Sequence, residues 1–261
     1  MKLKKISIVI PTRNEEGNIE SLVTEINKSL WKIPHEIVFV DDSTDATWEC
    51  INRVAARQSE YNVTGEHREN GNGLAGAVIR GFELASGDYI AVMDADFQHP
   101  PGLLREMYCA MRRGADICIP SRFISGGSDG GLGPWRKLVS SAARYIGKIF
   151  LPCLRKISDP TGGVYMFRKE LLDDVTLRPV GWKIMIEMLA SCKYGKIIEI
   201  PYSFGKRTAG ASKLDANVTV QYIRQVFSLK SGCTYNRVKV IRWTKERLNK
   251  EVDSLDVQLM D

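Results

Sequence analysis

Short apolar runs alternate with amphipathic stretches through the first 120 residues of this 261-residue chain. Apolar runs of strand length that end in polar or turn residues indicate buried strands, and apolar positions three and four residues apart indicate helices. Strands that alternate with helices predict a mostly parallel sheet, so we expect an α/β fold. The predicted strands are 5–11, 35–40, 61–66, 89–93 and 116–120, and the predicted helices are 18–30, 44–57, 74–85 and 101–113.

Two later stretches have the spacing of amphipathic helices and carry basic residues around their apolar positions. They lie at 138–150 and 214–229. A basic amphipathic helix can lie in a membrane interface, and the alternative is ordinary packing against the protein body. We favour the interface for both. The segment 125–134, which follows Arg122, holds five glycines and predicts a loop that can cover a binding site.

The end of the chain repeats apolar positions at alternating steps of three and four residues. This heptad spacing predicts a helix with an apolar seam, either as a short coiled coil or packed on the body. The seam positions are Val238, Ile241, Leu248, Val252, Leu255 and Leu259, with Lys245 as the polar member.

Composition adds an uneven charge to an otherwise ordinary globular chain. The net charge is +6, and the excess is concentrated in 206–250, where eleven Lys/Arg face only Asp215 and Glu246. Such a stretch can bind an anionic membrane or a phosphorylated ligand. We expect no nucleic acid partner.

The same composition bears on location. No stretch approaches the ~20 apolar residues of a membrane span, and the run 6–10 is too short for a signal-peptide core. The six cysteines form no CxxC pair and no zinc spacing, so we expect reduced thiols. We expect a peripheral protein at the cytoplasmic face of a membrane, without signal peptide or transmembrane helix.

The strongest chemical signal is the segment 94–98, Asp-Ala-Asp-Phe-Gln, directly after the apolar run 89–93. Strand alternation would point Asp94, Asp96 and Gln98 to one side. Carboxylate and amide oxygens are hard ligands that suit Mg²⁺ or Mn²⁺, and these ions usually also take oxygens from a substrate phosphate. We therefore expect a Mg²⁺ or Mn²⁺ site that receives a nucleotide sugar.

Polar residues follow two other predicted strands at the same edge of the sheet. Pro11 ends the first strand, Arg13 follows it, and Asp42 follows the second. Ligands of parallel α/β sheets bind beyond the carboxyl ends of the strands, and a carboxylate can accept hydrogen bonds from a base or a ribose. In chain order these residues outline a nucleoside ahead of a metal-bound diphosphate at Asp94.

Three cations can hold phosphate. Arg122 follows the strand 116–120, and Arg207 and Lys213 flank Gly210 in a basic loop. Arginine can make two hydrogen bonds to phosphate, and lysine acts as a point charge. The glycine allows a turn that brings both loop cations onto one anion; the alternative is a solvated basic loop.

As a set, these segments resemble the inverting family 2 glycosyltransferases of the GT-A fold, and among them the dolichyl-phosphate (polyprenyl-phosphate) mannose synthases. The resemblance extends over residues 5–229 and implies a Rossmann-like, mostly parallel sheet flanked by helices, followed by C-terminal amphipathic helices. The matching segments are 8–15, 40–47, 87–90, 93–101, 120–123, 159–163, 181–184 and 207–213.

The resemblance implies a donor site at the strand ends. Its metal ligands would be Asp94, Asp96 and Gln98. Its nucleotide-binding residues would be Pro11, Arg13, Glu15, Asp42 and Asp94. Arg13 stands where this family often has tyrosine, so stacking on the base is not implied here.

The resemblance also implies an acceptor side and a catalytic group. The acceptor phosphate would be held by Arg136, Ser140, Arg207 and Lys213. Arg122 would contact the donor phosphates. The catalytic group would then consist of Asp94, Asp96, Arg122, Arg207 and Lys213.

The implied reaction is inverting transfer of a hexose, mannose from GDP-mannose, to a polyprenyl or dolichyl phosphate. Processive relatives carry Q-x-x-R-W, but here Gln221 and Arg224 are followed by Gln225. One alternative within the class is a UDP-glucose or UDP-GlcNAc donor. A nucleotidyltransferase would need a lysine-rich first loop, which 11–17 lacks. A non-catalytic lipid-binding or regulatory subunit is the alternative from another class.

The chain lacks the transmembrane helices that some relatives carry. The membrane surface would then be reached through the amphipathic segments, a membrane-anchoring subunit or a homo-oligomer. We accordingly divide the chain into a GT-A catalytic domain at 1–213, an amphipathic membrane-interface helix at 214–230 and a basic, heptad-patterned helical tail at 231–261.

Overall fold

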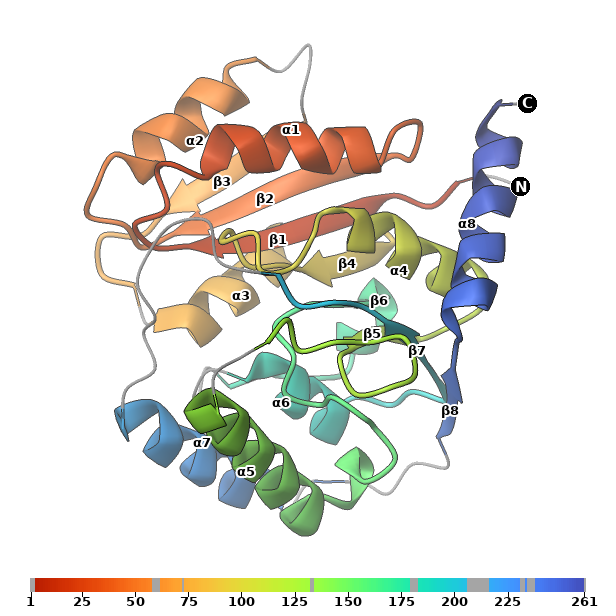
Figure 1. Cartoon of the computed structure of the whole chain (residues 1–261). Coiled ribbons are helices and arrows are strands. Elements are labelled where there is room, and N and C mark those ends of the chain that lie inside the picture. The colour runs from red at the N-terminus through yellow and green to blue at the C-terminus, as the bar shows by residue number, and fades with distance from the viewer. Residues whose placement is uncertain are drawn as a thin grey trace.

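A computed structural model places a mixed eight-stranded sheet between two layers of helices (Figure 1). The structure describes residues 3–57, 62–71, 73–131, 134–178, 183–205, 216–230, 233 and 238–260; the side chains of 134–139 and 216–220 lie outside the description. The strands are β1 (Ile6–Thr12), β2 (His35–Asp41), β3 (Val63–His67), β4 (Tyr89–Val92), β5 (Ile117–Ser121), β6 (Tyr165–Arg168), β7 (Lys196–Pro201) and β8 (Lys239–Arg242).

The strand order is β3-β2-β1-β4-β6-β5-β7-β8. Neighbouring strands run parallel except at β6, which is antiparallel to both β4 and β5. The carboxyl ends of β1, β2, β3 and β4 therefore meet at one edge, on the left of Figure 1. This is the edge where ligands of parallel α/β sheets bind.

Two apolar clusters fill the spaces between the sheet and its helices. Alternate residues of β1 show the division, since Ile8 and Ile10 join one cluster and Val9 the other. The first cluster lies under α1 (Ile19–Ser29), α2 (Thr47–Ala55), α4 (Gly102–Arg112) and α8 (Lys245–Met260). The second lies under α3 (Gly73–Leu84), α5 (Pro134–Phe150), α6 (Ile184–Ser191) and α7 (Ala216–Leu229), together with the short helices η1 (Pro152–Leu154) and η2 (Lys169–Leu172).

The α/β fold and all nine elements expected in the first 120 residues are confirmed, with end shifts of a few residues. Beyond that point the apolar pattern did not predict β6, α6 or β7. The sheet thus reaches further along the chain than the predicted alternation of strands and helices.

The helical tail is predicted only in part. Residues 239–242 form β8, the edge strand beside β7, and not the start of a helix as the heptad spacing suggested. The helix begins at Lys245, and its buried residues Leu248, Leu255 and Leu259 belong to the same cluster as α4. The seam is therefore packed on the body and not part of a coiled coil, and 231–261 includes a strand of the main sheet.

The two amphipathic segments form α5 and α7, which lie side by side at the lower end of the molecule (Figure 1). The hydroxyl of Tyr222 on α7 donates to the carbonyl of Ala143 on α5 at 2.7 Å, and Tyr222 and Val226 are buried. The face of α7 that holds Tyr222 and Val226 therefore packs against the protein body and does not face a membrane interface. Among the described side chains of the pair, the large hydrophobic ones that are exposed are Tyr145, Ile149 and Phe227.

One buried carboxylate near the amino ends of the strands makes stability depend on pH. Glu36 accepts hydrogen bonds from Lys5 Nζ at 2.7 Å, from Ser7 Oγ at 2.5 Å and from the Ser86 amide at 2.7 Å. Burial by itself would raise the pKa of Glu36, but these hydrogen bonds outweigh it and lower the pKa from 4.5 to about 2. The folded state thus favours the ionised carboxylate.

We expect Glu36→Gln to lower the free energy of unfolding by about 1–3 kcal/mol at pH 7, because an amide nitrogen would face the same donors. Since the folded pKa lies below the unfolded value, the contribution is present above pH 4.5 and disappears as pH falls toward 2. Urea unfolding of both proteins across this range should show their midpoints converging. Glu20→Gln, which removes an exposed 3.4 Å ion pair with Arg53, is the control and should change little. A constant difference between Glu36→Gln and the parent at all pH values would contradict this assignment.

Candidate active site

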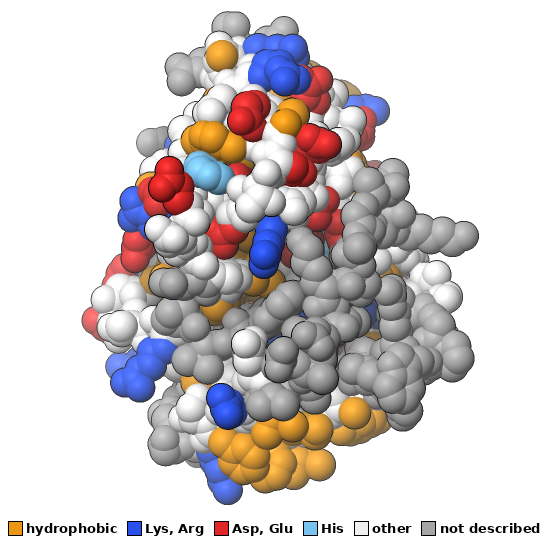
Figure 2. Space-filling model, turned by 90° about the vertical axis from the view of Figure 1, so that its left-hand side faces the viewer, with side chains coloured by type: hydrophobic (Ala, Val, Ile, Leu, Met, Phe, Trp, Pro, Cys, Tyr) orange, Lys and Arg blue, Asp and Glu red, His pale blue; other side chains and the backbone are white. Residues whose placement is uncertain are grey.

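The register of the sheet brings the predicted nucleotide residues to one edge. Thr12 is paired with Asp41, and the amide of Asp42 donates to the carbonyl of Thr12 at 2.9 Å. On the other side of β1, the amide of Met93 donates to the carbonyl of Val9 at 3.1 Å. The residues that follow β1, β2 and β4 therefore begin side by side. Figure 2 looks onto this edge and shows acidic side chains gathered on its upper part.

Asp41 organises this edge from below. Its fully buried carboxylate accepts hydrogen bonds from Thr12 Oγ1 at 2.7 Å, from Ser43 Oγ at 2.5 Å and from His67 Nδ1 at 2.8 Å. These contacts join the ends of β1, β2 and β3. Trp48 stacks on His67 with ring centroids 5.6 Å apart. Asp41 thus has a structural role, because its carboxylate connects the strand ends on which the site lies.

Asp42 lies beside it and faces Arg68, which follows β3. The Arg68 guanidinium donates from Nε and Nη2 to the two carboxylate oxygens at 2.8 and 2.7 Å. Gly71 approaches the same carboxylate so closely that a Cβ there would lie 2.3 Å from it. The contacts with Arg68 and Gly71 therefore fix the orientation of the Asp42 carboxylate.

The loop after β1 is fixed by side chains around α2. Asn14 adopts a left-handed backbone with φ of 58°, and its amide donates to Ser43 Oγ at 2.8 Å. The amide of Glu15 donates to Thr47 Oγ1 at 2.8 Å. Pro11 is buried within β1, which continues to Thr12, whereas Arg13 is exposed. The predicted nucleotide residues Arg13, Glu15 and Asp42 thus lie around one loop pair.

The segment Asp94–Gln98 does not continue the strand. β4 ends at Val92, and Phe97 has a φ of 59°, so the argument from strand alternation is wrong for these residues. A turn places them instead. The amide of Gln98 donates to Asp96 Oδ1 at 3.0 Å, and its carbonyl accepts from the Gly205 amide at 2.8 Å.

The two carboxylates of this turn differ in exposure. Asp96 is buried with 5% exposed, while the side chain of Asp94 is 39% exposed. Among the described residues no three His, Cys, Asp or Glu side chains form a metal cluster. The chain itself offers two carboxylates and the Gln98 amide, a hard oxygen set that fits Mg²⁺ or Mn²⁺ when substrate or water completes the shell.

His99 closes the back of this turn. It is buried, its Nδ1 lies 3.7 Å from Asp94 Oδ2, and that nitrogen has no hydrogen-bond partner among the described atoms. Its ring stacks on Tyr202 and meets Phe204 edge-on. Burial lowers the pKa of His99 to about 4, so the ring is neutral at neutral pH. A neutral imidazole brings no positive charge to Asp94.

Arg122 is held in a buried ion pair. Its Nε and Nη2 donate to the two carboxylate oxygens of Asp159 at 2.7 and 3.0 Å, with Asp159 fully buried and the Arg122 side chain 9% exposed. Burial would lower the pKa of Arg122, but the bonds to Asp159 outweigh it and raise the pKa. The guanidinium is a fixed positive charge.

The remaining predicted residues are placed only in part. Ser140 lies half-buried on α5, and the backbone of Arg136 lies on the same helix, but the Arg136 side chain is outside the described residues. Arg207 and Lys213 are also outside them. The described structure thus brings together the donor-side residues, and the acceptor-side predictions stay predictions.

Five further residues of this region had no predicted role: His67, Arg68, His99, Asp159 and Lys183. The last three lie in the segments 93–101, 159–163 and 181–184, which the family resemblance included without assigning them a function. A hydrogen-bond partner far along the chain, as for Arg122 and Asp159, leaves no periodic signal.

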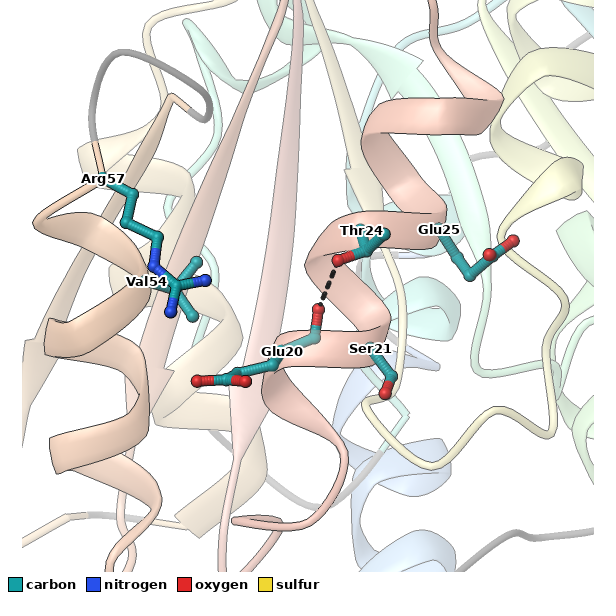
Figure 3. Close-up of a pocket in the computed structure, with 6 residues that line it drawn as sticks. All are labelled: Glu20, Ser21, Thr24, Glu25, Val54 and Arg57. Carbon is teal, nitrogen blue, oxygen red and sulfur yellow. Dashed lines mark hydrogen bonds between the residues drawn. The ribbon is translucent and has the colours of Figure 1, made fainter.

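A separate hollow between α1 and α2 is lined by side chains of both helices (Figure 3). The hydroxyl of Thr24 in this hollow is bonded to the carbonyl of Glu20 at 2.9 Å. None of its residues belongs to a predicted site, and we assign it no function. The lining residues are Glu20, Ser21, Thr24, Glu25, Val54 and Arg57.

Comparison with known proteins agrees with this geometry. Residues 7–176 match the family described as Glycosyl transferase family 2. The chain is 43% identical over 226 residues to the dolichol-phosphate mannosyltransferase of Pyrococcus furiosus, covering 86% of this chain and 63% of that protein. It is 33% identical over 236 residues to the protein of the same name from Saccharomyces cerevisiae, covering 85% and 86%. The chain therefore spans less than two thirds of the Pyrococcus relative.

A solved structure shares the fold. The glucosyl-3-phosphoglycerate synthase from Mycobacterium tuberculosis, crystallised with Mn²⁺, uridine diphosphate and glucosyl-3-phosphoglycerate, matches with a TM-score of 0.62 and 22% identity, covering 88% of this chain and 80% of that one. At this identity the likeness concerns the fold, and it agrees with the GT-A-like α/β architecture of the eight-stranded sheet.

Proposed function

The chain belongs to glycosyl transferase family 2, and on that premise we propose that it moves mannose from GDP-mannose to a polyprenyl phosphate of the dolichyl type. The observation that carries the proposal is the convergence of Asp42, Asp94 and Asp96 at one edge of the sheet, with Arg122 fixed nearby as a cation. The names of the two curated relatives supply the sugar and the lipid.

In the proposed reaction an oxygen of the acceptor phosphate attacks the anomeric carbon of the sugar. The bond from that carbon to the diphosphate breaks, its electron pair leaves with GDP, and the configuration inverts. A phosphate monoester has a second pKa of about 6, so the acceptor is already anionic near neutral pH and requires positioning instead of a general base.

The donor-side residues have the following roles in the proposed reaction. Asp42, oriented by Arg68, would accept hydrogen bonds from the nucleoside, and Asp94, Asp96 and Gln98 would hold Mg²⁺ or Mn²⁺. The bound ion would stabilise the charge on the departing diphosphate. Arg122 would add a fixed positive charge for the same phosphates. On the acceptor side we propose Arg136, Ser140, Arg207 and Lys213 as ligands of the lipid phosphate.

A lipid acceptor requires contact with a membrane surface. Among the described residues no helix has the length and apolar character to cross a bilayer. Hydrophobic side chains gather at the lower end of the molecule, where α5 and α7 lie (Figure 2). Phe150 and Phe227 meet with centroids 4.9 Å apart, and Lys230 lies over Phe150. We propose that this end contacts the membrane, alone or with an anchoring subunit or a second copy.

We expect Ile149→Asp combined with Phe227→Asp to weaken binding to vesicles that contain phosphatidylserine by about tenfold or more, because each exposed apolar side chain contributes about 1–2 kcal/mol when buried. Both side chains are more than half exposed, so the fold should be kept. Vesicle co-sedimentation measures the change. Trp31→Asp, at an equally exposed aromatic beyond the end of α1, is the matched control. Unchanged binding of the double variant would exclude this face as the anchor.

Donor profiling tests the function as a whole. Purified protein with Mg²⁺ or Mn²⁺ and a polyprenyl phosphate is offered radiolabelled GDP-mannose, UDP-glucose or UDP-GlcNAc. We expect label in the lipid from GDP-mannose. Label from UDP-glucose alone would overturn the sugar and keep the reaction class, and no transfer from any donor would favour the non-catalytic subunit.

A further inference from the structure

We propose that Lys183 is a positioning residue of this active site, which holds the segment 159–163 against Asp94 and Arg122. The proposal rests on the proposed glycosyl transfer for its effect on turnover, but the contact itself belongs to the fold. Lys183 directly precedes α6, and its Nζ donates to the carbonyl of Thr161 at 2.7 Å. This bond ties the start of a helix to the middle of a loop twenty-two residues earlier.

The loop that Lys183 holds touches both halves of the site. At its start, Asp159 fixes the guanidinium of Arg122 with two hydrogen bonds. At its end, Gly163 faces Asp94, and a Cβ on Gly163 would lie 2.7 Å from Asp94 Oδ2. A shift of a fraction of an ångström in this loop would therefore move Arg122 and close or open the space in front of Asp94.

Charge supports the same role. The charged groups that act on the Lys183 ammonium are Asp94, Asp159 and Arg122. Burial lowers the pKa of Lys183, while the two carboxylates oppose that effect. The ammonium thus partly offsets the charge of the two carboxylates, Asp94 and Asp159. If the Lys183 ammonium is removed, Arg122 is the cation of this group that still opposes the charge of Asp94 and Asp159.

Lys183 is itself anchored from behind. Its carbonyl accepts a hydrogen bond from Gln225 Nε2 on α7 at 3.3 Å, and Gln225 is buried with 1% exposed. Lys183 therefore stands between α7, on the proposed membrane side, and the loop at Asp94. A residue fixed at both ends can set a position, which a mobile surface lysine cannot.

The test compares Lys183→Met with Lys169→Met. Methionine keeps an unbranched apolar stem and removes the donor and the charge. Lys169 makes the same kind of bond, from Nζ to the carbonyl of Ala85 at 2.6 Å, but its hydrogen bonds within the described part of the chain do not involve the site. Steady-state kinetics give kcat and the donor KM, and hydrogen exchange reports the protection of the peptide spanning 158–165. Lys183→Gln serves as a second variant if Lys183→Met does not fold.

For Lys183→Met we expect kcat to fall by about thirtyfold or more with the donor KM within about threefold, since misplacement near the reacting atoms mainly affects the transition state. Exchange in 158–165 should accelerate in Lys183→Met and not in Lys169→Met. Lys183→Arg, which keeps donor and charge, should recover part of kcat. Unchanged exchange in 158–165 would overturn the positioning role even if no donor were turned over. Equal kcat for the two methionine variants, with an active parent, would overturn it and leave the proposed function standing.

Discussion

We expect Asp96→Ala to reduce sugar transfer by about a thousandfold or more, because it removes a carboxylate that would stabilise the departing diphosphate through the metal. Asp96 is buried within the turn, and its Oδ1 accepts the amide of Gln98. The substitution therefore removes one proposed metal ligand. It also removes a hydrogen bond that fixes Gln98, which is another proposed ligand. Asp94→Ala should be similarly severe, while its greater exposure should make it less harmful to the fold.

The measurement is transfer of label from GDP-mannose to a polyprenyl phosphate, with Mn²⁺ binding by calorimetry as a second readout. Asp88→Ala is the matched control, since Asp88 precedes β4 at its amino end and accepts the Lys5 amide. The control should keep both transfer and Mn²⁺ binding. If Asp96→Ala retained transfer, the turn at 94–98 would not be the metal site. If it lost transfer and still supported a cellular role, the non-catalytic alternative would gain weight.

The part of the fold that local patterns predict is the first 120 residues. There β1, β2, β4 and β5 are buried runs rich in apolar residues, and each helix has an apolar stripe, so these elements follow from periodicity. β3 gives a weaker signal, because only its first residue, Val63, is buried. β6 is different, because a four-residue strand inserts antiparallel between β4 and β5 from a distant part of the chain. Such a pairing depends on long-range packing, which the spacing of Tyr165–Arg168 does not contain.

Apolar stripes predicted helices better than they predicted what the helices contact. Tyr222 and Phe227 lie on one predicted amphipathic helix, but Tyr222 is buried against α5 and Phe227 is exposed. The apolar stripe on α8 was compatible with a coiled coil or with packing on the protein body. In the structure its buried residues pack in the same cluster as those of α4. Periodicity indicates that a face is apolar, and the partner comes from tertiary structure.

The site divides in the same way. Asp42, Asp94 and Asp96 could be predicted because each follows a strand whose end lies at the ligand-binding edge. Asp41 and Asp42 are neighbours in sequence, yet Asp41 connects the strand ends and Asp42 is the oriented carboxylate. Only the positions of Thr12, His67 and Arg68 separate them. Three-dimensional contacts likewise decide that Arg122 pairs with Asp159. The same is true of the bond from Lys183 to the carbonyl of Thr161.

The pair of Arg122 and Asp159 carries the second large expected effect. We expect Asp159→Ala to lower the free energy of unfolding by about 3–5 kcal/mol, because it leaves a buried guanidinium without its counter-charge. The side chain of Arg122 is 9% exposed, and little water can reach it to compensate. Turnover should also fall, since the same guanidinium loses the two hydrogen bonds that fix it near the proposed diphosphate position.

A double variant separates the two consequences. Arg122→Met combined with Asp159→Ala removes both charges, so we expect it to regain at least about half of the lost stability and none of the turnover. Chemical denaturation gives the stability, and transfer from GDP-mannose gives the turnover. Glu66→Ala, which breaks a surface pair with Arg80 at 2.7 Å, should cost less than about 1 kcal/mol as the exposed counterpart. If the double variant were as unstable as Asp159→Ala, the cost would come from lost packing around Thr161 and not from an unpaired charge. If the double variant recovered turnover, Arg122 would have no part in holding the donor, because the reaction would then proceed without the guanidinium that Asp159 fixes.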